Sequence, residues 1–460
     1  MNLKNFFNFD SAETKTFPGG IHPNDAKEAT NKKEIINLDA PDVLVFPMSQ
    51  HIGAPAVPCV KPGDEVKAGQ LIGEASGFVS ANIHSSVSGK VIAVEPRLHS
   101  SGTKVNSVII ENDRNYELCD GLKGNDYKKL SAGELVEIVK NAGIVGMGGA
   151  TFPTHVKLSP PKDKIIDYVI INGAECEPYL TSDHRAMLET PEDIILGLKI
   201  IMKIFNLKTG YIAIESNKPD AFEVMKKYAE AEKECDIKVL SLKTKYPQGS
   251  EKQLIYAVTK RRVPKGKLPA DVGTIVDNID TCAAVARAVS KGMPLISRIV
   301  TVGGDCTANP SNFRVKLGTP VSYLLEKAGG LISEPKKLLM GGPMMGTALV
   351  SDEVSVTKGT SGILALSQSS TDNLSGTEAC LRCGKCVNAC PMNLLPNMLK
   401  LYADTGNYEM FEKYNYSECM ECGSCSYVCP ALQHPVQSIR AGKIKIREYN
   451  IKKQEEKGNE

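Results

Sequence analysis

The sequence has no run of apolar residues that approaches the roughly 18 to 20 residues of a membrane-spanning helix. The best candidate, residues 194–205, is short and contains Lys199 and Lys203, so it predicts a helix of the protein core. An excess of charge of one sign is also missing, because 55 Lys and Arg oppose 53 Asp and Glu. This balance excludes a polybasic nucleic-acid binder. Residues 1–7 lack the apolar region of a signal peptide, so we expect a protein of the reducing cytosol.

Cysteines, in contrast, are crowded, with eight of the fourteen between positions 380 and 429. They form the run Cys-x2-Cys-x2-Cys-x3-Cys-Pro twice. In a reducing compartment this clustering indicates metal ligation instead of disulfides. The spacing is that of two-cluster ferredoxins, in which the last cysteine of each run binds the other [4Fe–4S] cluster. The predicted ligand sets are Cys380, Cys383, Cys386 and Cys429 for one cluster, and Cys419, Cys422, Cys425 and Cys390 for the other.

Structural zinc is the alternative for these cysteines, because zinc also takes four thiolates. Two full copies of the ferredoxin spacing, each ending in Cys-Pro, favour iron–sulfur clusters. Residues 394–416 between the two runs have a helical pattern, which predicts an α-helical ferredoxin module.

The rest of the chain divides by its pattern of apolar residues. Up to about residue 115, short β-type runs separated by Gly and Pro predict a small β barrel-sandwich. This part resembles lipoyl and biotinyl modules without their attachable lysine, which indicates a scaffold role. Alternating strands and helices between about 130 and 295 predict an α/β layer structure. A third unit follows from about 298 to 365, so we expect a multidomain α/β protein.

The α/β region contains a second candidate site. Its first part is the loop Gly146-Met147-Gly148-Gly149-Ala150-Thr151-Phe152-Pro153-Thr154-His155-Val156-Lys157. Glycines let backbone N–H groups approach a phosphate or a ring carbonyl, and the lysine adds positive charge. The loop matches neither the Rossmann fingerprint nor a P-loop. Taken alone, such a loop is more often an ordinary turn.

Two further segments favour a binding site at this edge of the sheet. Residues 172–179 directly follow the apolar strand 167–171, and ligands of α/β sheets bind at the carboxyl ends of strands. Glu251 and Asn278 stand at the start of two predicted helices, and an asparagine amide offers a donor and an acceptor to a flavin or nicotinamide ring. The alternative is that Asn278 and Asp280 are helix caps and that Glu175 and Glu177 are solvated loop carboxylates.

The order of these motifs resembles the flavin- and NADH-binding 51 kDa subunit of respiratory complex I. The shared motifs are Gly-x-Gly-Gly-Ala-x-Phe-Pro-Thr-x-x-Lys, Asn-x-x-Glu-x-Glu-Pro, Gly-x-Glu and Asn-x-x-Thr. Three further segments make the resemblance more specific: residues 17–23, the complete sequence of residues 172–185 and the tail with the two cysteine runs. Together they are similar to the C-subunit family of the Rnf complex, the ion-translocating ferredoxin:NAD+ oxidoreductase, over about residues 17–435.

This resemblance implies an FMN and NADH site in the α/β domain. The glycine-rich loop and two asparagines would hold FMN, and three glutamates would line the face where NADH enters. The implied cofactor-binding residues are Gly146, Gly148, Gly149, Ala150, Thr151, Phe152, Thr154, Lys157, Asn172, Glu175, Glu177, Glu251, Asp277 and Asn278. The sequence departs from the complex I pattern where Ala174 replaces an acidic residue, Ser250 a glutamate and Asp277 an asparagine. No catalytic residue is assigned.

The resemblance also implies domains and partners. The domains would be a barrel-sandwich at 1–125, an FMN/NADH-binding α/β domain at 126–296, an SLBB domain of β-grasp type at 297–366, a dicluster ferredoxin at 367–435 and a solvated, charged tail at 436–460. The chain would lie on the cytoplasmic face of the cell membrane as a peripheral subunit. It would pass electrons between NAD(H), FMN and the two [4Fe–4S] clusters, with other Rnf subunits as partners and ferredoxin reached indirectly.

Two other functions fit the same motifs. One is a soluble cobalamin reductase of the microcompartment type, which shares the glycine-rich loop and the clusters. The other is a flavin-free electron-transfer adaptor whose α/β domain serves only for docking. FMN content and membrane partners distinguish the three functions.

Overall fold

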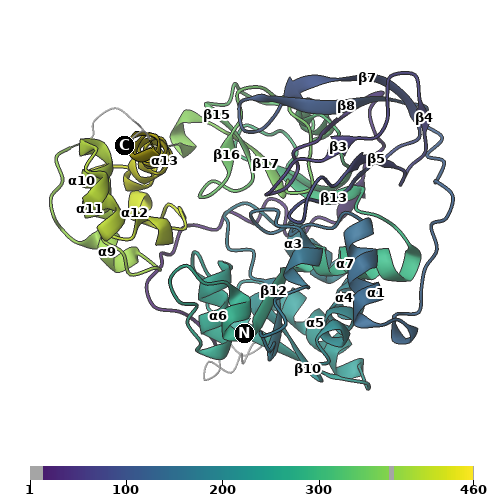
Figure 1. Cartoon of the computed structure of the whole chain (residues 1–460), viewed down its shortest axis with the longest axis horizontal. Coiled ribbons are helices and arrows are strands. Elements are labelled where there is room, and N and C mark those ends of the chain that lie inside the picture. The colour runs from purple at the N-terminus through teal and green to yellow at the C-terminus, as the bar shows by residue number, and fades with distance from the viewer. Residues whose placement is uncertain (1–13, 372–377, 459–460) are drawn as a thin grey trace, which may run out of the picture.

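The structure is a computed structural model that describes residues 14–371 and 378–458. Figure 1 shows a β barrel-sandwich and a second β unit at the top, an α/β domain below, and a helical domain at the left end. The N-terminal segment joins the last two, since Lys15 bridges to Leu242 and Gly20 N–H donates to Ala389 O at 3.0 Å. Within the described ranges, no helix has the length and apolar character to cross a membrane.

The barrel-sandwich consists of two small antiparallel sheets. Its strands are β2 (Val43–Pro47), β3 (Val57–Pro58), β4 (Glu65–Val66), β5 (Leu71–Glu74), β6 (Ile83–His84), β7 (Gly89–Leu98) and β8 (Lys104–Asn112). One sheet has the order β2-β8-β7-β4 and the other β3-β5-β6. Most strands are short because Gly and Pro interrupt the apolar runs. Leu44, Phe46, Ile72 and Ile83 are fully buried in the shared core.

The α/β domain is built on a parallel four-stranded sheet. Its strands are β9 (Tyr168–Gly173), β10 (Thr209–Glu215), β11 (Asp236–Leu242) and β12 (Thr274–Asn278). Its helices are α1 (Ala132–Asn141), α2 (Thr154–Lys157), α3 (Ser182–Glu189), α4 (Pro191–Ile204), α5 (Pro219–Ala231), α6 (Glu251–Thr259) and α7 (Ile279–Lys291). The central strand β9 has a continuous apolar run at residues 168–171 because helices cover both faces of the sheet. Helices α1, α4 and α7 pack on one face, and α6 covers Ile170 and Val276 on the other.

The strand order β11-β10-β9-β12 determines where a ligand site is expected. The chain passes from β9 to β10 and β11 on one side and then returns to β12 on the other side of β9. Ligands of open α/β sheets bind at the carboxyl ends of the strands, where the order reverses in this way. The last residues paired between β9 and β12 are Asn172 and Asn278. The two candidate asparagines therefore stand side by side at this edge.

The third unit is a mixed six-stranded sheet with one helix. Its elements are β1 (Ile35–Asn37), β13 (Ser297–Gly303), β14 (Ser311–Lys316), α8 (Val321–Lys327), β15 (Lys337–Met340), β16 (Thr347–Ala348) and β17 (Gly362–Leu366). The strand order is β1-β14-β13-β17-β15-β16. Strand β1 comes from the segment that the sequence assigned to the barrel-sandwich, but it pairs in parallel with β14. A strand of three residues is too short to be assigned from its pattern.

The C-terminal domain is helical. Its helices are α9 (Lys385–Ala389), α10 (Pro396–Thr405), α11 (Tyr408–Lys413), α12 (Ser424–Tyr427) and α13 (Pro435–Gly458). Leu399, Phe411, Ile439 and Ile446 form its core. The last two belong to α13, so the expectation of a solvated tail is wrong for the first half of this helix. Residues seven positions apart fall on one helix face, which here packs against α10.

Short 3-10 helices lie in the connections, at Tyr127–Lys129, Pro269–Val272, Gln368–Ser370 and Tyr416–Glu418. None of them contains a buried residue, although Tyr127, Val272 and Tyr416 pack against the edges of the cores. The architecture is therefore multidomain α/β, with an N-terminal barrel-sandwich and a helical C-terminal domain, as the sequence predicts.

The contact between α4 and α7 generates a stability prediction. A Cβ at Gly197 would lie 2.0 Å from Cys282 O, so Gly197→Ala forces the two helices apart. We expect the free energy of unfolding to fall by about 1–3 kcal/mol, the usual effect of overpacking a core. The matched control is Gly133→Ala in α1, where a Cβ meets nothing within 4 Å and alanine stabilises a helix by up to about 1 kcal/mol. Denaturant unfolding checks both, and equal midpoints for the two variants would contradict the prediction.

Candidate functional site

The glycine-rich loop connects α1 to α2 beside the carboxyl ends of β9 and β12. Its ends are joined, since Gly146 N–H donates to Phe152 O at 2.8 Å. Its middle is bound to α7 and β13, because Met147 N–H donates to Thr281 Oγ1 at 2.8 Å and Arg298 donates to Met147 O at 3.1 Å. The backbone of the loop is therefore held in one conformation by the protein itself.

Gly148 and Gly149 lack side chains in this loop, and their surroundings differ. A Cβ at Gly148 would lie 2.9 Å from the Cβ of Asn278, so the loop can approach the sheet only without a side chain. A Cβ at Gly149 would meet nothing within 4 Å, so the backbone there borders open space. Open backbone without side chains fits the phosphate or ring of a flavin nucleotide.

The two candidate asparagines are both engaged in this structure. Asn172 Nδ2 donates to Gly249 O at 2.7 Å, and Asn278 Nδ2 donates to Asp183 Oδ2 at 2.6 Å. Asn278 Oδ1 also accepts from two N–H groups in the first turn of α7. The helix-cap alternative is therefore correct for Asn278. Its contact with Gly148 shows that the same residue also positions the loop.

Lys157 forms a charged centre next to the loop. Its Nζ donates to Val276 O at 2.6 Å and lies 3.3 Å from Glu251 Oε1 and 3.6 Å from Asp277 Oδ1. The Asp277 side chain is 1% exposed, and neither of its oxygens has a hydrogen-bond partner among the described residues. Burial raises the pKa of Asp277 to about 6, although Lys157 opposes this shift. The structure thus brings together three predicted residues around one buried charge.

The two glutamates of the 172–179 segment make separate contacts. Glu175 accepts from two N–H groups at the start of α3, at 2.7 and 3.3 Å, so it caps that helix. Glu177 accepts from the N–H groups of Met344 at 3.0 Å and Met345 at 2.9 Å, in the turn after β15. Burial raises the pKa of Glu177 to about 7, against the effect of these two N–H groups. The alternative that both are solvated loop carboxylates is therefore wrong.

Two buried lysines that the sequence analysis missed hold this segment. Lys27 Nζ donates to Glu177 O at 2.9 Å, and Lys218 Nζ donates to Ala174 O at 2.6 Å. Between these anchors, Glu175 has a φ of +45°, a left-handed conformation that few side chains adopt. A single buried lysine has no sequence pattern, so nothing in the sequence distinguished these two from surface lysines.

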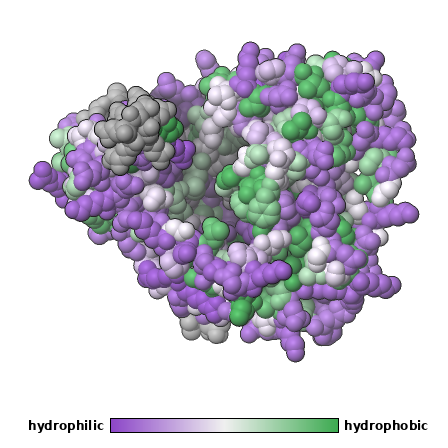
Figure 2. Space-filling model, viewed as in Figure 1, coloured by the Kyte–Doolittle hydropathy of each residue, from purple (hydrophilic) through white to green (hydrophobic). Residues whose placement is uncertain are grey.

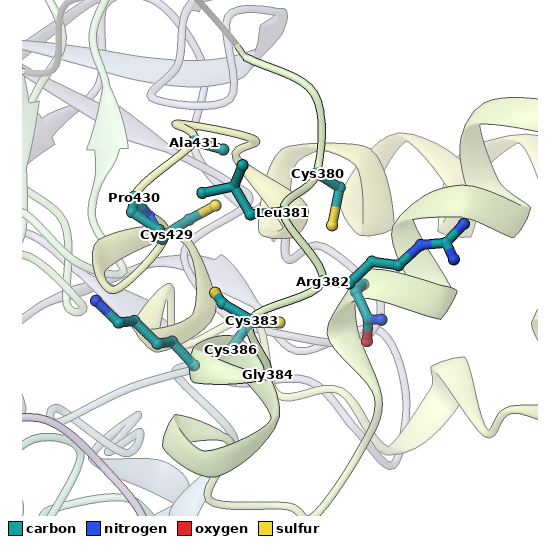
Figure 3. A pocket seen from close by; sticks show the side chains of 11 residues that line it. Cys380, Leu381, Arg382, Cys383, Gly384, Cys386, Cys429, Pro430 and Ala431 are labelled. Atoms are coloured by element: carbon teal, nitrogen blue, oxygen red, sulfur yellow. The ribbon is translucent and has the colours of Figure 1, made fainter.

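Four of the predicted cluster ligands surround one pocket in the C-terminal domain (Figure 3). They are Cys380, Cys383, Cys386 and Cys429. Cys380 and Cys383 are exposed. The pocket is partly open to solvent and is lined by four sulfur donors, the ligand set that a [4Fe–4S] cluster takes from a protein.

The other four predicted ligands are less exposed. They are Cys390, Cys419, Cys422 and Cys425. Burial, together with the nearby Cys419, Cys422 and Cys390 thiols, raises the pKa of Cys425 to about 12. Thiolates this close repel one another, and the positive charge of an iron–sulfide core relieves such repulsion. In both sets, the last cysteine of one run lies with the first three of the other.

Helix α6 connects the less exposed set to the α/β domain. Lys252 Nζ lies 2.9 Å from Glu418 Oε2, and Gln253 Nε2 donates to Pro391 O at 3.1 Å. Both side chains directly follow Glu251, the partner of Lys157. One turn of α6 therefore contacts the charged centre of the flavin candidate and the loops that carry the cysteines.

Comparison with known proteins agrees with this arrangement. Residues 15–115 match the model of the RnfC barrel sandwich hybrid domain, 139–287 the Nuo51 FMN-binding domain, 299–348 the SLBB domain and 373–430 a 4Fe-4S dicluster domain. The chain is 48% identical, over 429 residues and 93% of each chain, to the C subunit of the proton-translocating ferredoxin:NAD(+) oxidoreductase complex of Clostridium ljungdahlii. The chain belongs to the Rnf C-subunit family.

Two further relatives of this Rnf protein are also C subunits of such complexes. The C subunit of the Na(+)-translocating ferredoxin:NAD(+) oxidoreductase complex of Acetobacterium woodii is 46% identical over 432 residues, 94% of this chain and 97% of the relative. The C subunit of the ion-translocating oxidoreductase complex of Rhodobacter capsulatus is 43% identical over 447 residues, 97% of this chain and 86% of the relative. A solved NAD+-reducing [NiFe]-hydrogenase is a looser likeness, with a TM-score of 0.48 and 16% identity over 68% of this chain and 63% of that chain.

These findings confirm the predicted family, the fold class and the presence of FMN-binding and 4Fe-4S dicluster domains in this Rnf protein. The individual ligand residues stay predictions. The structure adds Arg298, Lys27 and Lys218, which hold the predicted loops through main-chain carbonyls. Their role depends on neighbours that are distant in the chain.

The buried carboxylate of Asp277 generates a pH prediction. Its pKa of about 6 in the folded protein exceeds the ordinary value of 3.8, so the folded state binds this proton more tightly than the unfolded chain. The proton on Asp277 makes its full contribution to the free energy of unfolding below about pH 4. This contribution is lost as the pH rises to about 6. An asparagine at this position would carry no charge at any pH, so Asp277→Asn should not lose stability as the pH rises. At neutral pH we expect its free energy of unfolding to exceed that of wild type by about 1–3 kcal/mol.

The matched control is Asp271→Asn. A Leu268 N–H group and Lys164 lower the pKa of Asp271 below its ordinary value of 3.8. Its stabilising effect is lost only below that pH, so this substitution should destabilise the protein both at about pH 4 and at about pH 7. Unfolding midpoints of the flavin-free proteins at about pH 4 and pH 7 give both differences. An unchanged pH slope in Asp277→Asn would show that the carboxylate titrates normally.

Proposed function

We propose that this chain is the C subunit of an ion-translocating ferredoxin:NAD+ oxidoreductase and passes electrons between NAD(H), FMN and two [4Fe–4S] clusters. Relatives that carry this activity in their names are 46–48% identical over nearly the whole chain. The observation that carries the proposal is the contact of α6 with the cysteine loops through Lys252 and Gln253. This contact supports a short path between the proposed flavin site and one proposed cluster.

In this proposal the glycine-rich loop and the ends of β9 and β12 hold FMN. When bound, FMN exchanges hydride with a nicotinamide and single electrons with iron–sulfur clusters. The loop presents open backbone at Gly149, and Asn278 keeps the loop against the sheet at Gly148. The residues proposed to form the FMN and NADH site are Gly146, Gly148, Gly149, Ala150, Thr151, Phe152, Thr154, Lys157, Asn172, Glu175, Glu177, Glu251, Asp277 and Asn278.

The two cysteine sets would hold the clusters in series. We define the inner set as Cys390, Cys419, Cys422 and Cys425, and the outer set as Cys380, Cys383, Cys386 and Cys429. The inner set adjoins α6, and the outer set has two exposed cysteines. Electrons would therefore pass between the flavin and the outer set through the inner set.

A partner protein would exchange electrons at the outer set. The helical domain projects from the molecule, and Figure 2 shows a hollow between it and the rest of this face. Leu381 beside the outer set is 65% exposed, and Arg382 and Lys385 also line the pocket (Figure 3). Because ion translocation requires a membrane, we propose that other Rnf subunits hold this chain at the cytoplasmic face, with ferredoxin reached through them. The relatives do not favour a cobalamin reductase.

Flavin binding tests the proposed function directly. Full-length protein reconstituted anaerobically with iron, sulfide and FMN should retain flavin absorbance, and NADH should bleach the clusters. Gly148→Ala should lose FMN because its Cβ meets Asn278, whereas Gly133→Ala should retain it. Retention of no flavin by the wild-type chain, with clusters that NADH does not bleach, would refute the proposal and favour the adaptor function.

A serine series tests the ligand sets. Cys429→Ser and Cys380→Ser should remove the same cluster, and Cys390→Ser should remove the other, because the last cysteine of each run serves the opposite cluster. Each variant should retain about four of eight irons. The control Cys59→Ser changes an exposed thiol outside both runs and should lose none. Iron and sulfide content with electron paramagnetic resonance of the reduced protein distinguishes the clusters, and matching spectra for Cys390→Ser and Cys380→Ser would contradict the pairing.

A further inference from the structure

Tyr246 lies where the N-terminal segment, the α/β domain and the helical domain meet. Its side chain is 1% exposed. Its N–H donates to Ile21 O at 2.9 Å and its O accepts from Ile21 N–H at 2.8 Å. The ring packs in one cluster with Ala389 and Cys422 of the helical domain. The backbone and the ring of Tyr246 are thus fixed from both sides.

The hydroxyl group of Tyr246 contacts two residues. Its Oη donates to Cys422 O at 2.8 Å and lies 3.4 Å from Glu177 Oε1. A tyrosine hydroxyl has one proton, and the shorter contact has the length of a good O–H···O hydrogen bond. The proton therefore points toward the main chain of a proposed inner-set ligand.

Glu177 lies on the second side of this hydroxyl. Its two oxygens accept from the N–H groups of Met344 and Met345. A Cβ at Gly342 would lie 2.2 Å from Glu177 Oε2, and a Cβ at Gly423 would lie 3.3 Å from Met344 O. The turn after β15 therefore touches both the carboxylate and the loop that carries Cys422. A hydroxyl with so many fixed neighbours has a single orientation.

We propose that Tyr246 is a positioning residue for the cluster of the inner set. Its hydroxyl holds the Cys422 carbonyl, and so sets the orientation of the 419–425 ligand loop and the reduction potential of that cluster. The inference rests on the proposed function, which supplies the cluster, but it assigns a role to a residue outside both cysteine runs. Hydrogen bonds and dipoles around the ligands are among the factors that set cluster potentials.

The direction of the effect follows from the charge. Reduction adds one negative charge to the cluster, and the positive end of the Tyr246 O–H dipole points toward its ligand loop. The dipole therefore stabilises the reduced form. Without the hydroxyl, the inner cluster becomes harder to reduce, while the outer cluster keeps its potential because Tyr246 contacts none of its four cysteines in the described hydrogen bonds.

The experiment compares Tyr246→Phe with wild type in the reconstituted, full-length protein. Phenylalanine fills the same buried space, so we expect unchanged iron and sulfide content. At a fixed solution potential, the ratio of reduced to oxidised inner cluster should fall by up to about tenfold, the effect of one hydrogen bond near a charged group. The outer cluster should not change. Spectroscopic redox titration, with the two clusters told apart by the serine variants, measures both ratios.

Two further variants complete the test. Tyr211→Phe, in the first half of β10, is the matched control and should leave both clusters unchanged. Glu177→Gln retains the shape and removes a carboxylate near the inner set, so it should make the inner cluster easier to reduce, opposite to Tyr246→Phe. If Tyr246→Phe does not fold, Tyr246→Met, which also lacks the hydroxyl, takes its place. Unchanged potentials in Tyr246→Phe, or equal shifts of both clusters, would overturn the inference while leaving the proposed function intact. Absence of clusters in wild type would instead refute the proposed function.

Discussion

Buried cations that donate to main-chain carbonyls hold the units of this protein together. Arg298 reaches from β13 to Met147 O in the glycine-rich loop at 3.1 Å and to Lys358 O at 2.7 Å. Lys358 Nζ in turn donates to Gly143 O at 2.7 Å and to Asn82 O, which joins the barrel-sandwich to the end of α1. Burial lowers the pKa of Lys358 to about 7, a measure of what its charge costs inside the protein. A shift of either loop would leave such a group unpaired, at a cost of several kcal/mol.

Buried lysines that donate to main-chain carbonyls also hold the segment that carries Glu175 and Glu177. Lys27 and Lys218 bind carbonyls on its two sides, which maintains the left-handed backbone of Glu175 between them. Strained conformations persist where their surroundings over-determine them, and they cluster at functional sites. The third unit also takes part, since its turn after β15 supplies the N–H groups that hold Glu177. The α/β domain alone would therefore present a less ordered site.

Sequence reasoning succeeded where the physical constraint is local. The cysteine spacing and the glycine-rich loop each encode a backbone path within about a dozen residues, so the candidate sites and the order of units could be predicted. It failed where partners are distant in the chain. Strand β1 has only three residues, and Tyr246 and Arg298 become informative only through contacts with Cys422 and Met147. The apolar residues of α13 were visible in the sequence, but the surrounding charges concealed their common face.

The two cysteine runs show most clearly what spacing leaves open. Their patterns are identical, yet Cys422 and Cys425 are buried whereas Cys380 and Cys383 are exposed. The difference comes from docking. Cys422 packs against Ile21, Tyr246 and Met344. Helix α6 contacts the loops beside Cys390 and Cys419. Exposure and nearby dipoles help to set the potential of an iron–sulfur cluster, so two predicted ligand sets of the same chemistry have unequal surroundings because of docking. The order of an electron path in this chain is therefore a property of how its domains pack, and no cysteine motif taken alone contains it.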